Sequence, residues 1–133
     1  MTHSLPWAKL EKLGVSLVVL HSLFVGALLV FIPEWTLKFA GWGGTDTLFF
    51  PRQSGAFHFV VAAGYFVEYR RCGSINLLVM AKTTAVVFLL VMSPWKEAWS
   101  VPFSGIADGL MLGGMLLVRH LAKRQTVPAS TRL

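Results

Sequence analysis

The sequence predicts an all-α integral membrane protein that forms a bundle of four transmembrane helices, with both termini in the cytoplasm. Three observations lead to this fold class. Hydrophobic residues make up 55% of the 133 positions and charged residues only 14%, whereas soluble domains carry about 25% charged residues. Several apolar runs approach the ~20 residues that a helix needs to cross a bilayer. The lysines and arginines outside those runs gather on one side of the resulting topology.

Four apolar segments are the predicted spans of a single transmembrane domain, which covers residues 1–133. The spans cover residues 14–32, 51–70, 75–92 and 102–120. Pro33 closes the first span and Pro94 follows the end of the third. Pro51 opens the second, because a proline at the first helical position loses no hydrogen bond. The first segment is longer than the apolar part of a signal peptide, and no A-x-A-like site follows it, so we expect it to be retained.

The distribution of basic residues predicts the orientation. Eight fall on the side of the termini and the second loop, namely Lys9, Lys12, Arg70, Arg71, Arg119, Lys123, Arg124 and Arg132. Three fall on the other side, namely Lys38, Arg52 and Lys96. Cytoplasmic loops carry the excess of Lys and Arg, so we expect both termini inside and a basic cytoplasmic tail over residues 121–133. Topology then accounts for the net charge of +6, and no nucleic-acid partner is expected.

The two outer loops are rich in tryptophan. They carry four of the five tryptophans of the chain, Trp35, Trp42, Trp95 and Trp99. Aromatic side chains gather where a membrane meets water, and a short helix over residues 34–42 would suit that interface. The alternative is that these side chains form a platform for a partner protein or an amphiphilic ligand.

Ionisable residues inside the spans call for partners, because a charge at the bilayer centre costs about 2.5–3.5 kcal/mol on insertion scales. Depths estimated from the rise of about 1.5 Å per helical residue sort them into two layers. The inner layer holds His21, Glu68 and Lys82, and we expect Lys82 to pair with Glu68. The outer layer holds Arg52, His58 and Asp108, and we expect Asp108 to pair with Arg52 or His58.

These six residues have two interpretations. Buried ion pairs can fix the register of helices without performing any chemistry. Alternatively, the layers handle protons, hold a quinone head group or line a polar substrate cavity. A separate packing signal is the stripe of Gly105, Gly109 and Gly113, whose spacing of four lets helix backbones approach closely.

Recognisable catalytic motifs are missing from the sequence. No H-x-x-x-H or H-E-x-x-H pattern occurs, so no metal site is predicted. Haem would need two facing histidines, but His21 and His58 are expected at different depths. There is no nucleotide-binding glycine motif and no G-x-S-x-G, so no catalytic residues are assigned. A bound quinone or lipid is the remaining cofactor hypothesis.

The four-span plan, "PRQSGAFHF" at the start of the second span, Lys82 in the third and "GIADG" in the fourth together resemble the DoxX-like group. These are small four-helix bacterial membrane proteins, and some are membrane subunits of thiosulfate:quinone oxidoreductase. The resemblance implies a multi-pass protein of the bacterial cytoplasmic (inner) membrane. It carries no catalytic residue over to this chain.

Three functional hypotheses follow. The first is an accessory or scaffold subunit of a larger respiratory or photosynthetic membrane complex, which packs through its helices and aromatic outer loops. The second is a small membrane oxidoreductase or quinone-site subunit that uses Arg52, His58 and Asp108. The third is a proton or small-solute transporter that uses His21, Glu68 and Lys82. The expected partners are the lipid bilayer and other membrane protein subunits.

Overall fold

The computed structural model describes residues 6–95 and 98–126, and all the regular elements within them are helical. The α-helices are α1 (Trp7–Phe31), α2 (Pro33–Phe39), α3 (Phe49–Cys72), α4 (Asn76–Met92) and α5 (Ser100–Thr126), and a short 3-10 helix covers Ser93–Trp95. Arg132 and Lys96 of the predicted charge pattern lie outside the described residues, as does the tail from residue 127.

The prediction of an all-α protein is confirmed, but the predicted bundle of four transmembrane helices is wrong. The described residues form five α-helices, and only α1 and α5 among them are long and apolar enough to cross a membrane. Helix α4 is apolar but has 17 residues. Helix α3 carries Arg52, His58, Glu68 and Arg70, which make it too polar to qualify. The fifth helix, α2, arises because the backbone breaks at Ile32 and Pro33 then starts a new helix.

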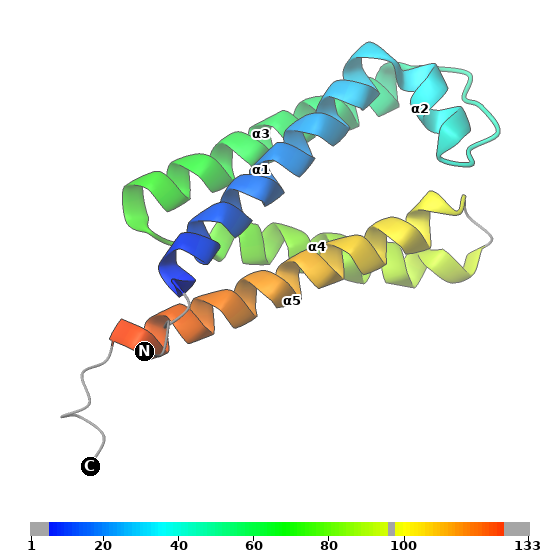
Figure 1. Ribbon diagram of the computed structural model, residues 1–133. Coiled ribbons are helices and arrows are strands. Elements are labelled where there is room, and N and C mark those ends of the chain that lie inside the picture. The colour runs from blue at the N-terminus through cyan, green and yellow to red at the C-terminus, as the bar shows by residue number, and fades with distance from the viewer. Residues whose placement is uncertain (1–5, 96–97, 127–133) are drawn as a thin grey trace.

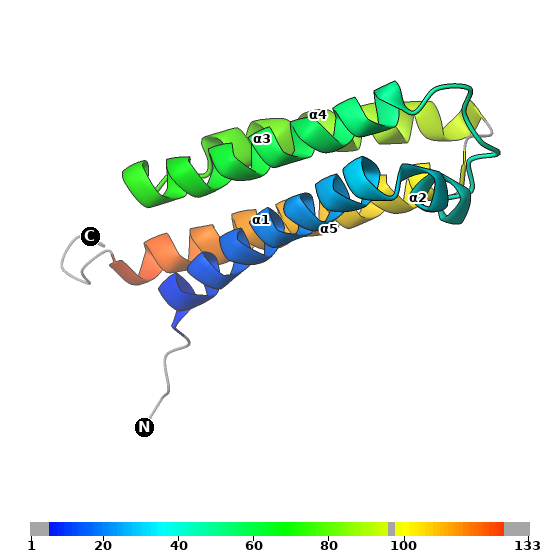
Figure 2. The same cartoon turned by 90° about the horizontal axis from the view of Figure 1, so that it is seen from above.

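The four long helices form two antiparallel pairs, α1 with α3 and α4 with α5 (Figures 1 and 2). The pairs meet mainly where α1 contacts α5, and the contact between α3 and α4 is slighter. The start of α1, the turn between α3 and α4, and the end of α5 lie at one end, which we call the terminal end. Helix α2 and the last turn of α4 lie at the opposite end, which we call the loop end.

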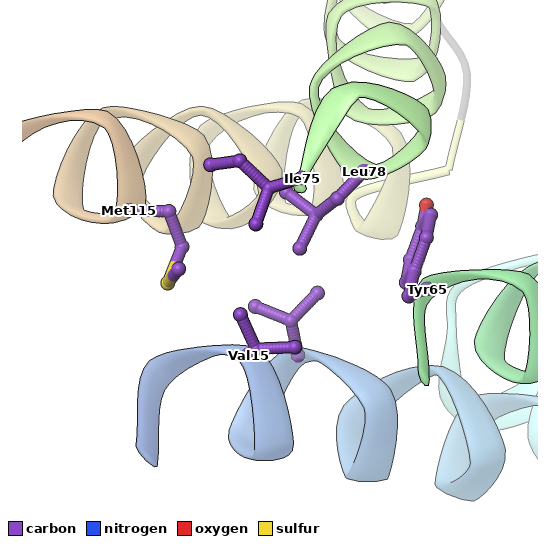
Figure 3. Packing of buried hydrophobic residues seen from close by; sticks show 6 residues of the cluster. Val15, Tyr65, Ile75, Leu78 and Met115 are labelled. Carbon is purple, nitrogen blue, oxygen red and sulfur yellow. The ribbon is translucent and has the colours of Figure 1, made fainter. Parts of the chain in front are cut away.

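An apolar core joins the four long helices in the half of the molecule nearer the terminal end. Its buried residues are Val15, Val18, Tyr65, Ile75, Leu78 and Met115, most of which point toward one another in Figure 3. Leu78, at 1% exposure, is the most enclosed of the large side chains. Outside this core, large apolar side chains face outward on every long helix, for example Phe24, Val60, Met80 and Leu110.

Hydrogen bonds fasten the terminal end around the turn between α3 and α4. Gly73 ends α3 in the left-handed conformation, with φ +59°, which glycine adopts without a steric penalty. The Glu68 carboxylate then accepts hydrogen bonds from the backbone N–H of Asn76 (3.1 Å) and of Leu77 (2.9 Å), which caps the start of α4. Arg119 donates to Glu11 Oε1 (2.7 Å) and to the carbonyl of Gly73 (3.0 Å), so one side chain of α5 ties α1 to this turn.

Aromatic side chains cluster at the loop end. Trp35 stacks on Phe39 with ring centroids 5.2 Å apart, and Trp99 meets both Phe39 and Phe103 edge-on. The Trp99 indole N–H also donates to the carbonyl of Phe39 (3.1 Å), which links the start of α5 to α2. Of the predicted loop tryptophans, Trp35, Trp42 and Trp99 are exposed, and the side chain of Trp95 lies outside the part that the structure describes.

Helices α1 and α3 approach each other closely at Gly26 and Gly55. A Cβ atom added to Gly55 would lie 2.7 Å from the Gly26 carbonyl oxygen, and one added to Gly26 would lie 2.9 Å from that of Gly55. The predicted stripe on α5 is less tight. Only Gly105 comes near a neighbour, with 3.3 Å between its added Cβ and Leu89, while Gly109 has ordinary contacts and Gly113 faces open space.

The crossing of α1 and α3 therefore requires glycine. We expect Gly55→Ala to lower the free energy of unfolding by about 1–3 kcal/mol, because the clashing atom is backbone and the helices must separate. Gly113→Ala is the matched control and is expected to leave stability unchanged or raise it by up to about 1 kcal/mol. Unfolding in detergent, monitored by circular dichroism, measures the free energy of unfolding of both variants. Equal effects of the two substitutions would contradict the close approach.

Candidate functional site

Lys82 and Asp108 form an ion pair between α4 and α5, inside the helical assembly. Lys82 is 4% exposed, and the Asp108 side chain is 14% exposed. The predicted pairing of Lys82 with Glu68 is therefore wrong, because Glu68 instead caps the start of α4. The predicted pairing of Asp108 with Arg52 or His58 is also wrong, because the Asp108 carboxylate accepts a hydrogen bond from Lys82.

Four of the six residues assigned to the two predicted polar layers lie in a single layer, whereas Arg52 lies closer to the loop end and Glu68 lies near the terminal end. Counted from the loop end, His21 lies ten residues before Phe31 and Lys82 ten residues before Met92. His58 lies nine residues after the start of α3, and Asp108 lies eight residues after the start of α5. At about 1.5 Å per residue, all four positions are roughly 12–15 Å from the loop-end helix termini. The depths predicted from the sequence were wrong for two reasons. The depth of Lys82 was measured from the inner end of its helix, whereas those of His58 and Asp108 were measured from the outer end. In addition, α5 begins two residues before the predicted span.

A pocket of about 180 Å³ opens beside the ion pair. Its polar lining comes from all four long helices, namely Ser22 of α1, Ser54, His58 and Tyr65 of α3, Lys82 of α4 and Asp108 of α5. Phe57, Val61, Ala81 and Ala85 supply the apolar walls. Ser54 and Phe57 are exposed, so the pocket reaches the surface of the protein beside α3. His21 does not line it but is close enough for the charges of Lys82 and Asp108 to act on it.

The pocket offers several hydrogen-bond donors. The Lys82 ammonium carries three protons, only one of which is needed for Asp108. Ser22, Tyr65 and the His58 imidazole can each donate one more. A ligand with carbonyl or other oxygen acceptors would complement this lining. Among the described residues, no group of three or more His, Cys, Asp or Glu side chains could hold a metal ion.

Three polar residues of the pocket, Ser22, Ser54 and Tyr65, were not among the predicted site residues. Tyr65 lies seven residues after His58, a spacing that places both on one face of α3, and this spacing was the signal that the sequence offered. Ser22 adjoins His21 in the sequence, but its hydroxyl could not be distinguished from that of a small packing residue. Arg52, which was predicted to belong to the site, is exposed, and no carboxylate in the described segments pairs with it.

Comparison with protein-family models, with curated proteins and with solved structures finds no match for this chain.

The ion pair can be tested by removing one partner and then both. Lys82→Met is expected to lower the free energy of unfolding by about 3–5 kcal/mol, because it leaves the Asp108 carboxylate buried and uncompensated. Adding Asp108→Leu should restore most of that loss, since both charges are then gone. Thr83→Met, an exposed neighbour on α4, should change stability by less than about 0.5 kcal/mol. Detergent-titration unfolding measures all four proteins, and a double variant no more stable than Lys82→Met would contradict the pairing.

Proposed function

We propose that this chain is a multi-pass membrane protein of the bacterial cytoplasmic membrane, whose interior pocket binds the head group of a quinone-type ligand. The pocket beside the Lys82–Asp108 pair is the observation that carries the proposal. Ionisable side chains are costly inside a membrane and are therefore kept mainly where they serve a site or pair with one another. Here they do both, since one side of the pair faces a pocket.

Placement in a bilayer is supported by the surface of the molecule. Helices α1 and α5 are each long and apolar enough to cross a membrane. Exposed apolar side chains continue over the neighbouring helices, for example Val60 and Phe66 on α3 and Phe88 on α4, each at least 53% exposed. In water this apolar surface would remain exposed, whereas lipid tails or another membrane protein would cover it.

The chemistry of the pocket suits a planar ring that carries carbonyl oxygens. Such oxygens accept hydrogen bonds, and the pocket supplies donors from Lys82, His58 and Tyr65. The faces of a ring need apolar neighbours, which Phe57 and Val61 provide. The resemblance to the DoxX-like group, some of whose members are subunits of a quinone-linked enzyme, also supports this ligand class.

The size of the pocket limits what it can enclose. A volume of about 180 Å³ is smaller than the ~300 Å³ at which sites for whole drug-sized ligands begin. A single ring fits, but a long apolar tail does not. The opening at Ser54 and Phe57 would let such a tail leave the pocket beside α3, among lipid chains.

Filling the pocket should weaken binding. We expect the purified protein to bind a short-chain benzoquinone, as measured by equilibrium dialysis in detergent, and Ala85→Phe to weaken that binding at least tenfold by occupying the space. Ala63→Phe makes the same change at an exposed position of α3 and should bind as the unsubstituted protein does. Circular dichroism checks that both variants keep their helices. Undetectable binding by the unsubstituted protein, or equal binding by Ala85→Phe, would disprove the proposal.

A second candidate function, an accessory subunit of a larger membrane complex, is favoured by the aromatic cluster at the loop end. Trp35, Phe39, Trp99 and Phe103 form a continuous set of ring contacts and are each at least 50% exposed. Exposed tryptophans packed against other aromatic rings are typical of the anchors of protein interfaces, and they also suit a membrane–water boundary.

Purification from native membranes separates this candidate from the first. An accessory subunit should elute from mild detergent with partner subunits at a fixed stoichiometry. Trp35→Ala should release those partners, because it removes an exposed ring of the cluster. Phe24→Ala, at an exposed position of α1 outside the cluster, should retain them. Elution of the unsubstituted chain alone or as a homo-oligomer would contradict the accessory role.

A further inference from the structure

A second and larger hollow lies between α1 and α3, away from the ion pair. It has a volume of about 420 Å³ and is lined mainly by apolar side chains. The two helices run side by side along it (Figure 1). We propose that this groove binds one anionic phospholipid, whose phosphate lies at Lys12 and Arg70 and whose acyl chain follows Leu20 and Leu23.

The lining changes from polar to apolar along the groove. On α1 it begins with Lys12 and Ser16 near the terminal end and continues with Leu20 and Leu23. Leu23 lies eleven residues after Lys12, which corresponds to about 16–17 Å of helix. On α3 the order is matched, because Arg70 lies closer to the terminal end than Phe66. A polar head group at one end and a hydrocarbon chain at the other complement this gradient.

The two cations of the groove are free to bind an anion. Within the described residues, neither Lys12 nor Arg70 has a carboxylate partner. Arg119, at the same end of the molecule, is by contrast occupied by Glu11 and a backbone carbonyl. The Arg70 guanidinium lies 5.6 Å from the centre of the Phe66 ring, which holds it over the groove by a cation–π contact. A guanidinium and an ammonium that flank one hollow are suited to phosphate oxygens.

A phospholipid suits the groove better than a free anion does. Inorganic phosphate would bind the two cations but would leave Leu20, Leu23 and Phe66 uncovered. Basic pockets between membrane helices are known to take lipid phosphates. The proposal shares with the quinone-type pocket only the placement of the helices in a bilayer, since the two sites have no residue in common.

Native mass spectrometry tests the groove with defined lipids. The detergent-purified protein is mixed with equimolar phosphatidylglycerol and phosphatidylcholine, and we expect one phosphatidylglycerol to remain bound preferentially. Lys12→Gln with Arg70→Gln should lower that retention on the order of 20-fold. Lys9→Gln with Arg71→Gln removes the same net charge from exposed positions at the same end and should retain the lipid fully.

A further variant tests the apolar half of the site. Leu20→Trp fills the groove and leaves both cations in place, so it should also lower lipid retention, whereas a site for inorganic phosphate would be unaffected. Equal retention of the two lipids, an equal loss in the Lys9 and Arg71 control, or full retention by Leu20→Trp would each overturn the inference. Loss of lipid selectivity while benzoquinone binding persists would overturn this inference alone and leave the proposed function standing.

Discussion

Lys82 and Asp108 bring a positive and a negative charge into an interior whose other buried side chains are nearly all apolar. Either charge alone would cost several kcal/mol to bury, and the cost is offset only where the two groups meet with good geometry. The ion pair therefore restricts how α4 can slide along α5. Ridges of apolar residues tolerate a shift of one turn far more readily than a buried charge does, so the pair selects one register from several that packing alone would permit.

The apolar core and the ion pair join the helices at different levels of the molecule. The core around Leu78 lies toward the terminal end and holds the four long helices together by burial. The polar layer lies toward the loop end, where the interior is hollowed by a pocket instead of being filled. The terminal end is further fastened by Glu68, Gly73 and Arg119. The terminal end therefore combines the apolar core with hydrogen bonds between helices, whereas the pocket beside the ion pair lies toward the loop end.

Hydropathy predicted where the long helices lie, but it did not predict all of their ends or the partners in the ion pair. The third predicted span, 75–92, is α4 within one residue, because Pro94 and the turn at Gly73 bound it. Helix α1 begins seven residues before the predicted span, since Lys9 and Lys12 are good helix formers that an apolar run does not reveal. The salt-bridge partners were missed because an error of one helical turn, about 5.4 Å, exceeds the reach of an ion pair. Glu68 was missed as a cap because its role depends on the reversal at Gly73.

The contact between Gly26 and Gly55 restricts which substitutions the chain can accept during evolution. Ser22 lies one turn before Gly26, and His58 lies about one turn after Gly55, so the crossing sets the distance between two walls of the pocket. A larger residue at either glycine would widen the pocket as well as loosen the helices. Under the proposed function, selection for packing and selection for ligand binding would act on the same two positions. A related chain that accommodates a different ligand would be expected to differ at this crossing, even though neither glycine lines the pocket.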